Sequence, residues 1–281
     1  MPRRRRGARL TFLGAAACAV SVSCCLLGCV PAGAAHEAAS FRPVVVQTRR
    51  VTVPGPGGEG ARGPVHVGAT LPRPTRAGDL LVAAVIDGVR TSGMRQPSWH
   101  LPGWRRAGEV IGGNTADGQR DDRRTGGLQA AIFYRPDAPA GVTSVEIGTV
   151  PEGTVADVTA VVAEVAGVPQ QLALVGTGSS TSGPTAATDS TASSVVVRRP
   201  GGRRPELVLT AFTNGGTAPH GERWIRPARW QVVGQDRSIR GIDQPILFDE
   251  TVWGSSPSPH QAVRYLGGRP VDNCALMVAL A

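Results

Sequence analysis

Short apolar runs separated by glycine and proline occupy the chain from about residue 41 to residue 281. The runs are rich in Val, Ile, Leu and Thr, and the 37 Gly and 23 Pro residues that fall between them leave no room for long helices. The pattern predicts strands at 44–53, 65–71, 80–86, 107–111, 128–134, 143–150, 155–165, 194–199, 206–213, 230–233 and 275–280. We therefore expect an all-β protein.

Two of these runs, 80–86 and 158–165, are apolar at every other position and also at most positions between. Strands with two apolar faces belong in the middle of a sheet that is covered on both sides. The run Val145-Glu146-Ile147 alternates instead, as a half-exposed strand does.

The strands follow an internal sequence repeat. An acidic residue followed by an apolar strand occurs at 78–84 and again at 205–211. Each copy is followed by a turn-rich segment and a tryptophan, and Trp104 matches Trp224 in this comparison. Each half then closes on an apolar run. Two similar halves predict one two-sheet antiparallel sandwich with an internal pseudo-repeat, with two tandem small sandwiches as the alternative.

The pseudo-halves are 41–175 and 195–281, and the Ser-, Thr- and Gly-rich segment 176–194 is the expected joint between them. Together they make one β-sandwich domain over 41–281.

The order of several short motifs resembles a known module. The motifs are 72–77, Gly78-Asp79-Leu80-Leu81-Val82-Ala83, Pro102-Gly103-Trp104, Ala131-Ile132-Phe133-Tyr134-Arg135, Ala163-Glu164-Val165-Ala166-Gly167-Val168, Glu206-Leu207-Val208-Leu209 and Ala275-Leu276-Met277-Val278-Ala279-Leu280. In this order they resemble the β-sandwich module of phage tail-associated and actinobacterial extracellular proteins. The resemblance implies a jelly-roll-like sandwich used for display or binding, without catalytic residues to carry over. The chain departs from that module in a long insert between Asn214 and Tyr265.

The first 34 residues have the pattern of a secretory signal peptide. Arginines precede an uncharged stretch over 10–27, and small residues ending in Ala32-Gly33-Ala34 follow. We expect a secreted protein with a short tail at 35–40. The alternative is a membrane-anchored lipoprotein, because Leu26-Leu27-Gly28-Cys29 has the outline of a lipobox whose Cys29 would be acylated. Apart from such an anchor, no contact with a membrane is expected.

Charge and cysteine content exclude some classes. The chain carries +9, and loss of the five leader arginines leaves +4. The cluster at 198–204 is split by Pro200-Gly201-Gly202, which is typical of a solvated hairpin, so no nucleic-acid partner is expected. Cys274 is the one cysteine after the leader, and its apolar neighbours predict a small buried side chain.

Metal and catalytic signals are weak. The oxygen-rich loop of Asn114, Asp117, Asp121 and Asp122 is a weak calcium candidate, because it lacks the spacing of a calcium loop and contains arginines. The later histidines, which are His66, His100, His220 and His260, are never paired at i, i+2 or i, i+4, so no metal or other cofactor is expected.

A hydrolase is the less favoured alternative. The run Gly176-Thr177-Gly178-Ser179-Ser180 lacks the G-x-S-x-G spacing of a nucleophile elbow. Asp243 could pair with Asp249 or Glu250 as the acid and base of a glycosidase, but adjacent residues of a strand point to opposite faces. We expect no enzyme.

Tryptophans give the best indication of a ligand. If Trp104 and Trp224 are framework positions, then Trp99, Trp230 and Trp253 are left over. Aromatic faces that stack on sugar rings are a common means of binding carbohydrate, so these three are the candidate ligand-binding residues. The sequence thus predicts a non-catalytic cell-surface or secreted binding module for a glycan or a surface protein. A structural envelope component without a soluble ligand is the alternative.

Overall fold

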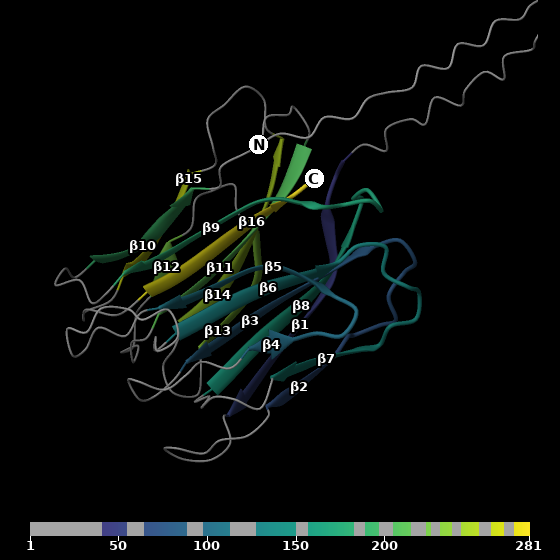
Figure 1. Cartoon of the computed structure of the whole chain (residues 1–281), viewed down its shortest axis with the longest axis horizontal. Coiled ribbons are helices and arrows are strands. Elements are labelled where there is room, and N and C mark those ends of the chain that lie inside the picture. The colour runs from purple at the N-terminus through teal and green to yellow at the C-terminus, as the bar shows by residue number, and fades with distance from the viewer. Residues whose placement is uncertain are drawn as a thin grey trace, which may run out of the picture. The chain divides into compact units, whose positions relative to one another are not determined.

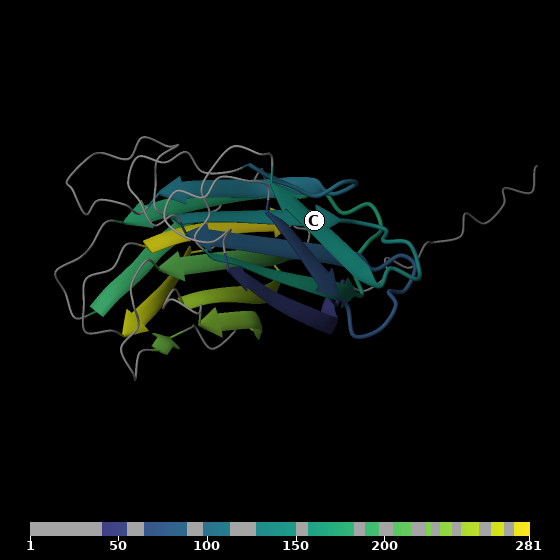
Figure 2. The ribbon, with the colours of Figure 1, turned by 90° about the horizontal axis from the view of Figure 1, so that it is seen from below.

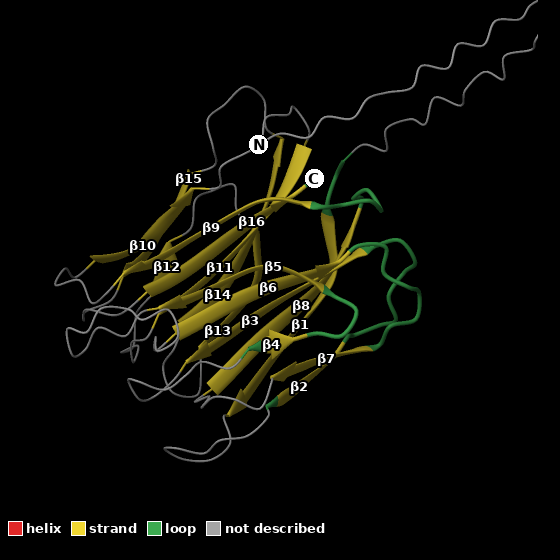
Figure 3. Ribbon diagram, in the orientation of Figure 1, coloured by secondary structure: helices red, strands yellow, loops and turns green. Residues whose placement is uncertain are grey.

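The computed structural model describes residues 41–54, 65–88, 98–112, 128–149, 157–182, 189–196, 205–214, 223–225, 231–237, 243–252, 260–266 and 273–281. Within these ranges the chain forms strands and loops and no helix, as Figure 3 shows. The all-β prediction is confirmed. The same residues accordingly contain no apolar helix of membrane-spanning length.

The sixteen described strands divide into two halves of eight. The first half contains β1 (Val44–Pro54), β2 (His66–Thr70), β3 (Leu80–Gly88), β4 (Trp99–His100), β5 (Arg105–Gly112), β6 (Leu128–Arg135), β7 (Ser144–Thr149) and β8 (Asp157–Ala166). The second half contains β9 (Leu174–Ser182), β10 (Asp189–Val196), β11 (Pro205–Asn214), β12 (Arg223–Ile225), β13 (Gln231–Arg237), β14 (Asp243–Val252), β15 (His260–Leu266) and β16 (Asn273–Leu280). Figure 1 labels them in chain order.

Both halves have the same topology. In the first half, sheet A has the order β1-β8-β3-β6-β5 and sheet B the order β2-β7-β4. In the second half, sheet C has the order β9-β16-β11-β14-β13 and sheet D the order β10-β15-β12. Adding eight to each strand number of sheets A and B gives sheets C and D. The chain is therefore a tandem repeat of an eight-stranded, five-plus-three antiparallel sandwich.

The four sheets stack in the order B, A, C, D. One apolar core lies between sheets A and B and includes Val67, Phe133 and Ile147. A second core joins sheet A to sheet C across the two halves. β10 of sheet D contacts β9 and β16 of sheet C. In Figures 1 and 2, strands of the first half, drawn purple to teal, lie against green and yellow strands of the second.

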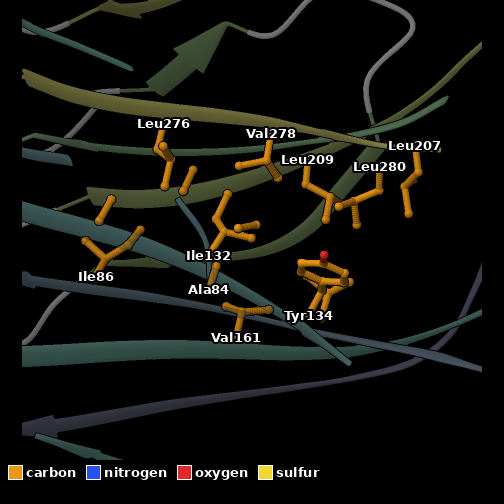
Figure 4. Packing of buried hydrophobic residues seen from close by; sticks show 14 of the residues in the cluster. Ala84, Ile86, Ile132, Tyr134, Val161, Leu207, Leu209, Leu276, Val278 and Leu280 are labelled. Atoms are coloured by element: carbon orange, nitrogen blue, oxygen red, sulfur yellow. The ribbon is translucent and has the colours of Figure 1, made fainter. Parts of the chain in front are cut away.

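The core between sheets A and C explains why two runs are apolar on both faces. Alternate residues of β3 enter different cores, so that Leu80 and Ile86 face sheet C while Val85 faces sheet B. In Figure 4, Ile132 and Tyr134 of sheet A and Leu276 and the other labelled residues of sheet C point toward one another. The expectation that 80–86 and 158–165 lie inside a sheet is confirmed, since β3 and β8 have neighbours on both sides.

Equivalent β-bulges recur in the two halves. Register shifts occur between Arg106 and Gly108 in β5 and between Val232 and Gly234 in β13. A Cβ at Gly108 would lie 3.0 Å from Leu276 Cδ1, and one at Gly234 would lie 2.7 Å from Val161 Cγ2. Val161 and Leu276 occupy the same position of β8 and β16. The bulge of β5 therefore packs on β16 and the equivalent bulge of β13 packs on β8, with a glycine at each contact. The contact between the two halves thus has approximate two-fold symmetry.

The expected all-β antiparallel sandwich with an internal pseudo-repeat is confirmed. Its described strands are divided among four sheets, two in each half, and residues from both halves share one core within the compact unit Glu37–Ala281. The expected joint at 176–194 instead contains most of β9 and most of β10. β9 forms although it is rich in Ser, Thr and Gly, because it pairs along its length with the buried strand β16.

The tryptophans also correspond differently. Trp99 and Trp224 lie in the equivalent strands β4 and β12. Trp104 immediately precedes β5, and Trp230 immediately precedes the equivalent strand β13. The match of Trp104 with Trp224 is therefore wrong. Trp99 and Trp230 are regular positions of the repeat, and Trp253 alone has no counterpart among the tryptophans of the first half.

Candidate functional site

The outer face of sheet B is the candidate site. β2 alternates between buried and exposed residues, so that Val67 and Ala69 enter the core while His66, Gly68 and Thr70 are exposed. This alternation follows from the two-residue period of a strand. The same period exposes Ser144 and Glu146 of β7 and His100 of β4, beside the less exposed Gly148. These seven residues are called the outer face below.

Strand register arranges the outer face in rows. His66 lies opposite Gly148 on one side, and His100 lies opposite Gly148 on the other. Gly68 lies opposite Glu146 in the next row. Two histidines that are 34 positions apart in sequence therefore flank one glycine on the middle strand.

The glycines let larger side chains lie flat across the face. A Cβ at Gly148 would lie 3.6 Å from His66 Nδ1 and 3.7 Å from its Cε1, so the imidazole lies over the middle strand at Gly148. A Cβ at Gly68 would lie 3.1 Å from Glu146 Oε1, so that carboxylate covers β2 in the same way. The face carries imidazole, carboxylate and hydroxyl groups, and none of its seven residues has a large apolar side chain.

Trp99 anchors the short strand that carries His100. Its ring is 3 % exposed and lies in the core between sheets A and B. Its Nε1–H donates a hydrogen bond to Oδ2 of the fully buried Asp87 on β3. After β4 the chain makes a tight turn from Leu101 to Trp104, in which the backbone N–H of Trp104 donates a hydrogen bond to Leu101 O at 3.1 Å. β4 has two residues, so this anchor fixes where His100 lies.

Asp87 belongs to a buried polar group at the end of sheet A. Its cross-strand neighbour Gln129 is also fully buried and donates from Nε2 to Glu109 Oε1 at 2.5 Å. Within the described part of the chain, Asp87 Oδ1 and Gln129 Oε1 have no hydrogen-bond partner. Burial raises the pKa of Asp87 well above its usual range, the charge of Glu109 raises this pKa further, and the hydrogen bond from Trp99 opposes both.

Asp87→Asn should therefore flatten the dependence of stability on pH. Because the folded pKa of Asp87 is raised, the folded state keeps a proton that the unfolded state loses above about pH 4. The free energy of unfolding should fall by about 1.4 kcal/mol per pH unit as pH rises from there through the folded pKa, and the substitution should remove this contribution. Urea unfolding of both proteins between about pH 5 and pH 9 measures it, and parallel profiles would contradict it. Asn214 already occupies the equivalent position of β11.

A carboxyl pair, Asp79 and Glu164, lies at the other end of sheet A. Glu164 is buried and accepts hydrogen bonds from Gln47 Nε2 at 2.5 Å and from the backbone N–H of Arg76 at 2.7 Å. Burial raises the pKa of the nearby Asp79, and its contact with Glu164 raises it further. The pair ties β1 and β8 to the connection between β2 and β3, so we assign it a structural role.

The ligand-binding tryptophans predicted from sequence fall in different places. Trp99 is buried, so it offers no ring face to a ligand in this structure, and its prediction as a stacking platform is corrected. Trp230 and Trp253 lie outside the described residues, as do Cys29 and the calcium candidates Asn114, Asp117, Asp121 and Asp122.

The glycosidase alternative is weakened by the position of its carboxylates in one strand. Asp243 and Asp249 both lie in β14, six residues apart. At about 3.4 Å per residue their Cα atoms are about 20 Å apart, against about 5–10 Å between the two carboxyl groups of a glycosidase. Glu250 lies one residue further.

Sequence reasoning missed the outer face because its residues come together through space. Spacing along one strand or helix does not detect histidines on β2 and β4 that meet across β7. The available signal was the alternation around His66, which places its side chain opposite to Val65 and Val67. In the second half the equivalent row is Thr191, Arg264 and Ile225, so the repeat does not require histidine here.

Comparison with known protein families, curated proteins and solved structures finds no match to this chain. The resemblance to phage tail-associated and actinobacterial modules therefore stays a prediction.

Proposed function

We propose that this chain is an exported, non-catalytic binding module that uses the outer face of sheet B to bind a glycan or another surface protein. The observation that carries the proposal is the exposed polar face of His66, Glu146 and His100, with Trp99 and Asp87 in the core behind it. Rigid strands that present polar groups suit binding, because little ordering is needed when the ligand docks.

The signal-peptide pattern of residues 1–34 supports export. The mature protein is then released, or it is anchored through Cys29. The intact mass of the processed protein distinguishes these two forms. The anchored form begins at Cys29 and carries the mass of its lipid, whereas the released form begins at Ala35 and carries no lipid.

The binding role is tested with Glu146→Ala. The mature protein is screened on a glycan array and against cell-envelope fractions, and the ligand found is titrated against Glu146→Ala, Trp253→Ala and the control Arg49→Ala, an exposed residue on β1. We expect Glu146→Ala to weaken binding about tenfold, or about 1.4 kcal/mol, with unchanged thermal unfolding. Arg49→Ala should bind as the parent does.

Each other result changes the assignment. Loss of binding in Trp253→Ala alone would move the site away from the outer face. Turnover of a bound glycan would indicate a hydrolase. No binding to any glycan or envelope fraction would leave a structural envelope component.

A further inference from the structure

We propose that His66 and His100 chelate a divalent transition-metal ion on the outer face of sheet B. The two residues stand in one row across β7, on strands that each pair directly with it. At the usual strand spacing their Cα atoms are about 10 Å apart. Both side chains are exposed on the same face of the sheet.

Gly148 supplies the space for the ion. Because the middle residue of the row has no side chain, no side chain of β7 stands between His66 and His100 in this row. The His66 ring lies over Gly148, with Nδ1 3.6 Å from the position that a Cβ would take. Any larger residue at 148 would stand between the histidines. The equivalent row of the second half has Arg264 in the middle, with Thr191 and Ile225 on either side.

The donor atoms select the kind of metal. Neutral imidazole nitrogen suits Zn²⁺, Ni²⁺ and Cu²⁺, whereas Ca²⁺ and Mg²⁺ prefer sets of oxygen ligands. Among the residues that the structure describes, no group of three or more His, Cys, Asp or Glu side chains is placed to bind a metal. The outer face therefore provides two ligands, and the remaining coordination positions are open to water or to a group on a bound partner.

The buried anchor gives this site a defined geometry. His100 immediately follows Trp99, which is fixed in the core by its hydrogen bond to Asp87. His66 is held by full pairing of β2 with β7. The backbone positions of the two ligands are thus fixed before the ion arrives, which lowers the entropy cost of chelation. The inference goes beyond the proposed function, because metal binding at these residues requires no glycan or protein ligand.

Isothermal titration of the mature, chelator-treated protein with ZnCl₂ and NiCl₂ tests the site. We expect one ion per chain, at least a tenfold loss of affinity in both His66→Gln and His100→Gln, and no binding in the double variant. His260→Gln, in β15 of the second half, is the matched control and should bind as the parent does. Urea unfolding without metal shows whether each variant is folded.

A second readout identifies the ligands directly. With Cu²⁺ as the probe, electron paramagnetic resonance of the parent should show hyperfine coupling from two imidazole nitrogens, and each single variant should show one. Absence of binding, or equal affinity in the parent and a folded His66→Gln variant, overturns the proposal. Folded histidine variants that lose the metal but keep glycan or protein binding would support the metal site and show that it is independent of the proposed function.

Discussion

Leu276→Ala should destabilise both halves of the protein together. Leu276 lies on β16, is 1 % exposed and packs into the core between sheets A and C beside the Gly108 bulge. Truncation of a buried leucine removes apolar contact and leaves a cavity, which costs about 2–5 kcal/mol. Because this core contains residues of both halves, the loss should appear in the unfolding of strands from either one.

Urea unfolding followed by tryptophan fluorescence and by far-ultraviolet circular dichroism measures this effect. Single transitions that coincide for the two probes, shifted together by the substitution, are the expected result. Val44→Ala is the control, because Val44 is 59 % exposed and its truncation should change the free energy of unfolding by less than about 0.5 kcal/mol. Two separate transitions, of which Leu276→Ala moves only one, would show that the halves fold independently.

Trp99→Ala should lower the free energy of unfolding by about 3–5 kcal/mol. The substitution removes a large buried ring from the core between sheets A and B and leaves Asp87 Oδ2 without its donor. Trp99→Phe separates the two contributions, since it keeps most of the ring and loses the Nε1–H. We expect a cost of about 1–3 kcal/mol for Trp99→Phe.

Thermal and urea unfolding of the two Trp99 variants give these values. Trp104→Phe is the matched control, because Trp104 is only partly buried at the edge of the same core. A cost for Trp99→Ala no greater than that of Trp104→Phe would mean that Trp99 does not anchor β4.

Much of the fold of the first half could be predicted from the sequence. The strands there bury one face or both faces. The spacing of their apolar residues therefore predicts both that a segment is a strand and whether it lies inside a sheet, as for 80–86. The second half was less readable. β14 contains a short apolar run, 246–248, between Pro245 and the acidic pair Asp249-Glu250, and β9 contains mainly Gly, Ser and Thr. β14 forms by pairing with β11 and β9 by pairing with β16, and these pairings cannot be predicted from the local sequence.

The candidate site could not be predicted, because it depends on register between strands. The sequence drew attention to Trp99 as a free aromatic ring, whereas its partner Asp87, twelve positions earlier, fixes it in the core. The neighbouring His100 and His66 were rejected as ligands because they are not paired in sequence, whereas their relation exists only once β2 and β4 lie on either side of β7. Pattern reasoning gives the face of one strand but not which residues of other strands share its row.

The back-to-back stacking of the two halves determines how two binding partners, one on each outer sheet, would be placed. Sheets B and D are the outermost layers, on opposite sides of sheets A and C. A partner on sheet B and a partner on sheet D would therefore be held apart by the whole thickness of the protein. Such a molecule cannot bring both faces to one flat surface to gain avidity, but it can bridge two separate ones. Because the rows of the two outer sheets also differ, with His66 in one and Thr191 in the other, those two partners need not be alike.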